Sequence, residues 1–223
     1  MTFSIAARDF ATGALGVAIT SSSICVASRC AFVRAGTGAA LTQNVTDPRL
    51  GPRALELMAE GLPAKDALAR LREEATQIAW RQLAAVDRDG RTAHFSGARA
   101  LGIHGAAEGA GCVAIGNLLA NPGIPGAMIE AFESASDALA ARLVGALEAG
   151  LAAGGETGPV RSAGVLVADR QLWPVVDLRV DWAEQPIAAL RALWSEYAPQ
   201  LEAYVSRALD PEAAPSFAAP ANR

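Results

Sequence analysis

Residues 2–20 read TFSIAARDFATGALGVAIT and set the architecture of the chain. From Thr2 to Arg8, small or polar side chains alternate with apolar ones, which is the period of a half-buried strand. Residues 9–13 have the composition of a turn, and residues 14–20 predict a strand that returns beside the first. The chain therefore begins with an antiparallel hairpin whose first strand starts at Thr2.

Runs of strands and pairs of helices alternate along the rest of the chain. Further strands are predicted at residues 31–35, 38–43, 80–86, 92–96, 112–117, 163–168 and 172–180. Helices are predicted at residues 50–60, 64–78 and 127–133, from the cap Ser136-Asp137 to Gly154-Gly155, and from Pro186 onward with a kink or split at Pro199. This order argues against a parallel βαβ sheet. It favours an α+β fold, a four-layer αββα sandwich of two antiparallel sheets covered by helix pairs.

The composition indicates one domain over residues 1–209, followed by a Pro/Ala-rich tail, residues 210–223, that is predicted to be disordered. The chain has 223 residues, of which 52% are hydrophobic, and a net charge of −4. A negative chain without a basic cluster argues against nucleic-acid binding. Residues 10–28 and 109–129 carry no charge but are too polar or too broken to cross a membrane, and no signal peptide is recognisable, so a cytoplasmic location is expected.

No cofactor or metal is expected. The three cysteines are an odd number without metal-ligand spacing and are interpreted as buried thiols. The two histidines, His94 and His104, likewise have no partner at such a spacing. Chemistry by side chains alone is therefore the expectation.

The residue after Met1 is a candidate nucleophile. If Met1 is removed, as is usual before a small residue, Thr2 carries its amine and hydroxyl on one residue. An α-amine has a pKa of about 7.7–8.0, so part of it is neutral near pH 7 and can accept the hydroxyl proton. The alternative is that Thr2 is an ordinary strand residue, and retention of Met1 would switch this mechanism off.

An acyl-transfer site also needs oxyanion donors and orienting groups. Asn117, at the end of an apolar strand, is a candidate catalytic donor. Asp177 lies in an apolar strand and is a candidate catalytic acid, expected to be buried beside Arg34, Arg161 or the amine of Thr2, with an ion pair to Arg179 or Arg34 as the structural alternative. The candidate substrate-binding residues are Ser21, Arg34, Gln43, Asn44, Arg161 and Ser162. Each of these also has an ordinary role open to it, as a turn, cap or surface residue.

Several segments carry a resemblance to a known family: residues 2–9, 13–18, 34–39, 42–43, 51–55, 116–117, 161–163 and 176–181. On these the chain resembles the DUF1028 family, which is itself similar to the Ntn (N-terminal nucleophile) hydrolases. The resemblance implies an Ntn-hydrolase-like αββα sandwich but no settled reaction. The chain departs from the family's pattern at one point, because it has Ser21-Ser22 where Ser-Lys is expected. The single lysine, Lys65, falls on a predicted surface helix.

The leading hypothesis is an Ntn-type amidohydrolase that cleaves a non-peptide C–N bond of a small amide through Thr2. One alternative is a non-catalytic protein on the same fold that binds a ligand or a partner. Another is a structural protein that assembles through its apolar helices. A homo-oligomer, most simply a dimer, is expected because related folds often pair through their helical layers.

Overall fold

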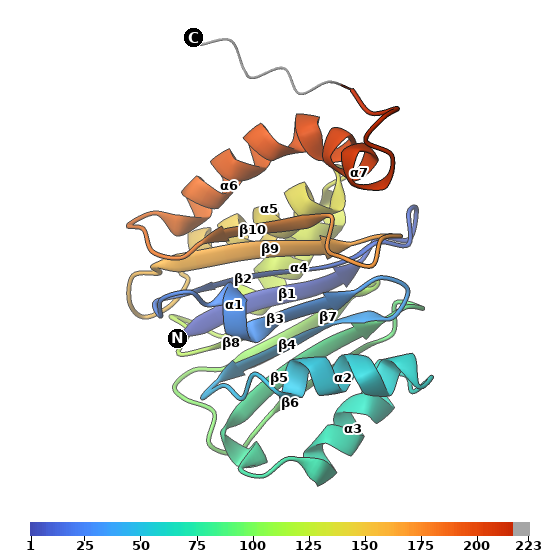
Figure 1. Ribbon diagram of the computed structural model, residues 1–223. Coiled ribbons are helices and arrows are strands. Elements are labelled where there is room, and N and C mark those ends of the chain that lie inside the picture. Colours follow the sequence, from blue (N-terminus) through green and yellow to red (C-terminus); the bar gives the residue numbers. More distant parts are fainter. Residues whose placement is uncertain (216–223) are drawn as a thin grey trace.

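The computed structural model describes residues 1–215 and arranges them in four layers, helices, sheet, sheet and helices (Figure 1). The predicted α+β class and αββα sandwich are thereby confirmed. Of the tail that was predicted to be disordered, residues 210–215 are described and form a turn, in which Ala214 N–H donates to the carbonyl of Asp210 (3.1 Å). Residues 216–223 lie outside the described part.

The larger sheet is antiparallel and has the strand order β10-β9-β2-β1-β8-β7. Its strands are β1 (Thr2–Arg8), β2 (Leu15–Ser21), β7 (Gly105–Gly109), β8 (Cys112–Asn117), β9 (Ser162–Ala168) and β10 (Val176–Val180). The predicted N-terminal hairpin forms its centre. Thr2 is opposite Ser21 on one side and opposite Asn117 on the other.

The smaller sheet is also antiparallel and has the order β3-β4-β5-β6. Its strands are β3 (Ala31–Arg34), β4 (Gly38–Asn44), β5 (Arg81–Asp87) and β6 (Thr92–Ser96). The Ser4 hydroxyl of β1 donates to Gln43 Oε1 of β4 (2.6 Å). The end of β4 at Asn44 therefore lies against the end of β1 at Thr2.

Helices cover the outer face of each sheet. The helices α4 (Ile124–Ser134), α5 (Leu139–Ala152) and α6 (Pro186–Tyr197) pack on the larger sheet, and α2 (Leu50–Ala59) and α3 (Ala64–Glu74) pack on the smaller one (Figure 1). Two short helices, α1 (Ala27–Cys30) and η1 (Ile78–Trp80), complete the connections. No helix in the described part of the chain has the length and apolar composition that a membrane span needs.

Pro199 interrupts the C-terminal helical region, as predicted. Helix α6 ends at Tyr197, the turn η2 (Ala198–Gln200) contains the proline, and α7 (Leu201–Leu209) follows. Proline lacks a backbone N–H and clashes with the preceding turn, so a continuous helix is disfavoured there. The rings of Tyr197 and Tyr204 stack across the break with centroids 5.5 Å apart.

Several predicted boundaries are wrong. Strand β7 and helix α1 were not predicted, and α3 ends at Glu74 rather than at residue 78. The predicted cap Ser136-Asp137 is not used, because α5 begins at Leu139 after Ala138. Strand β10 begins at residue 176, not 172, since Pro174 cannot donate to a sheet ladder.

Candidate active site

The space between the two sheets is apolar over most of its length. Its core includes Leu15, Val17, Leu41, Val86 and Ile115, which are all fully or almost fully buried. At the end where β1 begins, the side chains that face this space become polar. Seven of them are at most 6% exposed: Thr2, Ser4, Ser21, Gln43, Gln82, Asn117 and Ser162. We call these seven residues the polar layer.

The register of the larger sheet places four of these residues in one row. Ser162 of β9 is opposite Ser21 of β2, which is opposite Thr2 of β1, which is opposite Asn117 of β8. Directly opposed residues have side chains on the same face of a sheet. The sequence-predicted residues Thr2, Ser21, Asn117 and Ser162 are thus brought together as neighbours.

A hydrogen-bonded chain of amides satisfies the centre of the polar layer. The Ser4 hydroxyl donates to Gln43 Oε1, and Gln43 Nε2 donates to Gln82 Oε1 (2.8 Å). Asn117 Nδ2 donates to the same Gln82 oxygen (3.1 Å), and Gln82 Nε2 donates to the Gly116 carbonyl (2.9 Å). Because buried polar groups are costly unless paired, these bonds fix the side chains in single orientations. Sequence reasoning missed Gln82, although a glutamine at an inward position of an apolar strand was a usable signal.

The Thr2 hydroxyl lies at the edge of this layer, 3.2 Å from Ser21 Oγ. It donates to the Met1 carbonyl oxygen (2.5 Å), and Ser21 Oγ donates to that oxygen as well. Ser21 Oγ is held in place by the backbone N–H of Ser23 (3.1 Å). Two hydroxyl groups therefore converge on a single carbonyl oxygen, an arrangement that can also stabilise a developing negative charge.

Asn117 keeps unused hydrogen-bonding capacity. Its Nδ2 carries two hydrogens, of which Gln82 takes one. Its Oδ1 is buried and has no hydrogen-bond partner among the described residues. An unpaired buried acceptor costs about 1–3 kcal/mol, so Asn117 is suited to receive a donor at this position.

A carboxyl group that sequence reasoning missed, Glu156, lies at the same end of the molecule. It follows α5, is 6% exposed, and its Oε2 accepts the backbone N–H of Ser22 (3.2 Å). Its Oε1 has no partner in the described part of the chain. Burial raises the pKa of Glu156 to about 7, although the positive α-amino group of Met1 acts in the opposite direction. No sequence pattern marks this residue, because its burial depends on how the loop folds back over β2.

Ser162 and Arg161 shape the loop that follows Ser21. Ser162 Oγ donates to the Ser23 carbonyl (2.6 Å) and accepts the Val26 N–H (3.1 Å). The Arg161 N–H donates to the Ser21 carbonyl (2.7 Å). Both residues are at the predicted end of the sheet, and both act on the loop through hydrogen bonds to its backbone.

Asn44 supports another loop. Its Nδ2 donates to the Trp80 carbonyl (2.6 Å) and its Oδ1 accepts the Leu101 N–H (3.1 Å). Its neighbour Gln43 belongs to the polar layer. The amide of Asn44 is thus engaged at both ends, and the arrangement does not support the predicted substrate-binding role for this residue.

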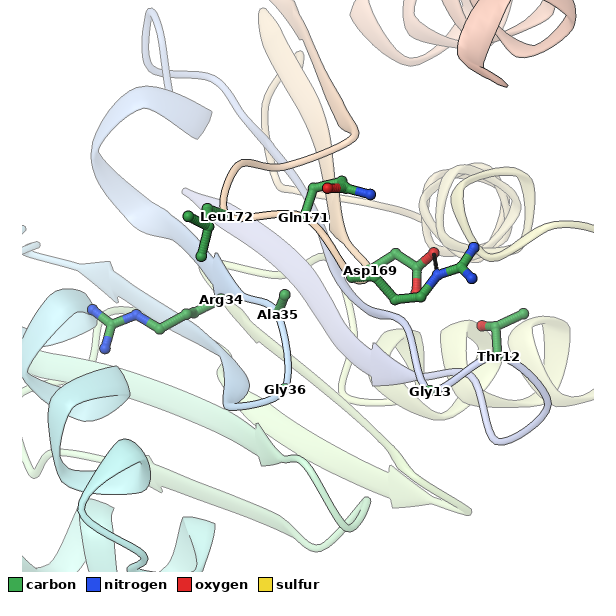
Figure 2. Close-up of a pocket in the computed structure, with 9 residues that line it drawn as sticks. Thr12, Gly13, Arg34, Ala35, Gly36, Asp169, Gln171 and Leu172 are labelled. Atoms are coloured by element: carbon green, nitrogen blue, oxygen red, sulfur yellow. Dashed lines mark hydrogen bonds and ion pairs between the residues drawn. The ribbon is translucent and has the colours of Figure 1, made fainter. Parts of the chain in front are cut away.

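Arg34 is at the opposite end of the sandwich, so its predicted place beside Thr2 is wrong. It pairs with Gly38 at the start of β4, whereas Gln43 is near the end of that strand. Arg34 lines a cavity of about 580 Å³ together with Thr12, Asp169 and other loop residues. Figure 2 shows these side chains. The prediction failed because β3 runs antiparallel to β4 and so carries Arg34 away from the polar layer.

The predicted burial of Asp177 near Thr2 is also wrong. Strand β10 is the edge strand of the larger sheet, and Asp177 is exposed there. Its carboxylate pairs with Arg179, 2.6 Å from Nε, so the structural alternative is confirmed. An exposed edge position explains why an acid is tolerated in this apolar strand, and Asp177 has no place in the candidate site.

Exposed apolar side chains surround this end of the molecule. They lie in loops that follow or precede the strand ends at the polar layer: Ile24, Val45, Leu101, Ile103 and Trp182.

Lys65 is exposed on α3, as expected. In residues 1–215 no group of three or more His, Cys, Asp or Glu side chains is arranged to hold a metal ion.

Comparison with known proteins adds a family. The model described as "Family of unknown function (DUF1028)" matches residues 2–190. The crystal structure of protein SPO2555 from Silicibacter pomeroyi, itself described as DUF1028, is 33% identical, with a TM-score of 0.82 over 88% of this chain and 89% of that one. Anbu (ancestral beta-subunit) from Yersinia bercovieri covers 97% of this chain and 100% of its own at 10% identity, with a TM-score of 0.39, a likeness too weak to carry an inference. No curated protein matches the sequence.

Proposed function

The chain belongs to the DUF1028 family, whose function is not known, and from that membership and the geometry of the polar layer we propose that it is an Ntn-type amidohydrolase. Cleavage of the Met1–Thr2 bond frees the Thr2 amine, and Thr2 Oγ1 is the nucleophile. The substrate is a small amide, and the bond broken is a non-peptide C–N bond.

The reaction has two steps that need no cofactor. The Thr2 amine accepts the hydroxyl proton as Oγ1 bonds to the amide carbon, and it returns that proton to the leaving nitrogen as the C–N bond breaks. Water then attacks the Thr2 ester, with the same amine as the proton carrier, and releases a carboxylate. Ser21 Oγ and the free hydrogen of Asn117 Nδ2 are the candidate donors to the oxyanion.

One observation carries the proposal. The hydroxyls of Thr2 and Ser21 both donate to a carbonyl oxygen that belongs to Met1, in a row that also contains Asn117. This supports a site that receives a carbonyl group next to a threonine hydroxyl.

The proposal is tested by intact-mass spectrometry before and after treatment with a β-lactone, which acylates reactive N-terminal threonine. The expected result is a mass without Met1 and a single adduct that peptide mapping places on Thr2. The Thr2→Ser variant keeps the adduct and Thr2→Ala loses it. An adduct that survives in Thr2→Ala, or a fully retained Met1 in the purified protein, overturns the proposal.

A second candidate is a non-catalytic protein on the same fold that binds a ligand or a partner. The observation that favours it is that the Met1 carbonyl already engages both hydroxyls. Retention of Met1 in that mass measurement, with no adduct on Thr2, is the result this candidate expects.

A further inference from the structure

We infer that the site recognises an α-aminoacyl group, that is, a free α-ammonium, the adjacent carbonyl and an unbranched apolar side chain. The inference rests on the proposed function in one respect, because cleavage of the Met1–Thr2 bond must first clear the place that Met1 occupies. Met1 is itself such a group. Each of its three parts is met by a different element of the site.

The carbonyl of Met1 is held by two donors. Thr2 Oγ1 and Ser21 Oγ both donate to its oxygen. Both side chains are buried, and the Ser23 N–H orients Ser21. A carbonyl delivered to this position lies next to the proposed nucleophile, which forms its bond to the carbonyl carbon.

The side chain of Met1 lies against the loop that precedes β9. Its sulfur is 3.2 Å from Thr157 Oγ1. A Cβ added to Gly158 would lie 3.2 Å from the Met1 methyl group and 3.6 Å from its sulfur. A side chain at Gly158 would therefore crowd the end of the Met1 side chain.

The α-amino group of Met1 lies within electrostatic range of an unsatisfied carboxyl group. Glu156 is 6% exposed and its Oε1 has no partner among the residues described. The Met1 amine acts on Glu156 through space, since no ion pair within residues 1–215 joins the two. A buried carboxylate with an unpaired oxygen is stabilised by a hydrogen bond and by a nearby positive charge. A free ammonium group supplies the hydrogen bond and the charge together.

These contacts exclude other amides. An N-acylated substrate has no ammonium for Glu156 and adds bulk where the Met1 amine lies. The geometry therefore points to amides of unblocked, apolar amino acids rather than to amides of simple carboxylic acids.

Calorimetric binding to the Thr2→Ala variant tests the inference, because that variant keeps Ser21 and Glu156 but cannot turn the amide over. The preparation is checked by mass for loss of Met1. We expect L-methioninamide to bind and N-acetyl-L-methioninamide to bind about tenfold more weakly or worse. Equal affinity for the two compounds, or no binding of either, overturns the inference.

Two further substitutions, each added to Thr2→Ala, separate the parts of the site. Glu156→Gln lowers the affinity for L-methioninamide about tenfold and leaves the affinity for the N-acetyl compound unchanged. Gly158→Val lowers the affinity for L-methioninamide but leaves the affinity for L-alaninamide unchanged. The matched control is Glu148→Gln, which removes the α5 carboxylate that pairs with Arg191 of α6 and leaves all affinities unchanged. An equal loss for free and acetylated compounds in Glu156→Gln contradicts the role of this carboxyl.

The failures of the two proposals are distinguishable. If L-methioninamide binds with the expected selectivity but no β-lactone adduct forms on Thr2 in the otherwise unaltered protein, the hydrolase proposal falls and the recognition of an α-aminoacyl group stands. If the adduct forms but the free amine makes no difference to binding, the recognition falls and the hydrolase proposal stands. Complete retention of Met1 overturns both.

Discussion

The side-chain oxygen of Gln82 accepts a hydrogen bond from Asn117 Nδ2 at 3.1 Å, and this bond joins the two sheets at their polar end. Gln82 belongs to the smaller sheet and Asn117 to the larger one. The same Gln82 oxygen accepts from Gln43, and its nitrogen donates to the Gly116 carbonyl. One fully buried amide thus fixes the orientation of a candidate oxyanion donor and also serves the contact between the layers.

Gln82→Leu is expected to destabilise the protein. The apolar side chain has a similar size, but Gln43, Asn117 and Gly116 lose their partner while they stay buried. The expected loss in the free energy of unfolding is about 3 kcal/mol. Urea denaturation measures it, with Gln200→Leu as the control, because Gln200 is exposed. A loss as small as that of the control would contradict the role of Gln82.

Ser21→Ala is expected to slow the acylation of Thr2. Loss of the Ser21 hydroxyl removes one of the two proposed donors to the oxyanion, and such a donor is worth about a hundredfold in rate. The time course of the β-lactone adduct measures the effect. Ser28→Ala is the control, since Ser28 is exposed and donates only to the Cys25 carbonyl. An unchanged rate in Ser21→Ala would remove Ser21 from the mechanism.

Glu156 is expected to make stability fall as the pH rises, in protein that bears Met1. Its pKa is raised from 4.5 to about 7, so between these values the folded state binds the proton more tightly than the unfolded state. The free energy of unfolding therefore declines across this window, by about 3 kcal/mol in the limit, and stays lower above it. Urea denaturation at pH 5 and pH 8 measures the decline. Glu156→Gln is expected to flatten it, and parallel profiles for the two proteins would refute the assignment.

Asp87 is expected to act in the opposite direction. Burial acts to raise the pKa of this carboxyl, but hydrogen bonds from Ala64, Arg91 and Asp89 outweigh it and hold the pKa below the usual value. Its stabilisation is present above the unfolded-state pKa of about 4 and is lost as the pH falls through the folded-state value. Asp87→Asn is expected to lower the free energy of unfolding by about 2 kcal/mol at pH 7 and by less at pH 3.

Thermal or urea denaturation at the two pH values measures this difference. Asp89→Asn is the control, because its carboxylate is exposed at the tip of the same hairpin. If Asp87→Asn is as mild as this control at pH 7, the hydrogen bond that Asp87 accepts from the Ala64 N–H at the start of α3 does not stabilise the fold.

The sequence predicted the layers well because hydrophobic periodicity marks where strands and helices run, although β1 is buried on both faces and not half-buried as its alternation predicted. The alternation from Thr2 to Arg8 located β1 with its ends, and Pro199 located the break between α6 and α7. Strand β7, residues Gly105–Gly109, was missed because its sequence GAAEG has no β-branched or aromatic residue. It is a strand only because its backbone pairs with β8.

The candidate site, too, could be predicted from the sequence only in part. Thr2, Ser21 and Asn117 could be predicted together, because adjacent strand ends meet at one edge of a sheet. Arg34 and Asp177 were misplaced because their positions depend on the direction of β3 and on which strand lies at the edge, and neither is written in local sequence.

The space between the sheets is apolar at one end and polar at the other, so the sequence can vary at one end without disturbing the other. The strand β1 packs between the sheets through Ala6 and contributes Thr2 to the polar layer. Replacements among the first few residues of β1 can therefore alter the polar layer while the far half of the same strand still holds the layers together. One scaffold can in this way present more than one set of polar side chains, with the difference confined to a single rim.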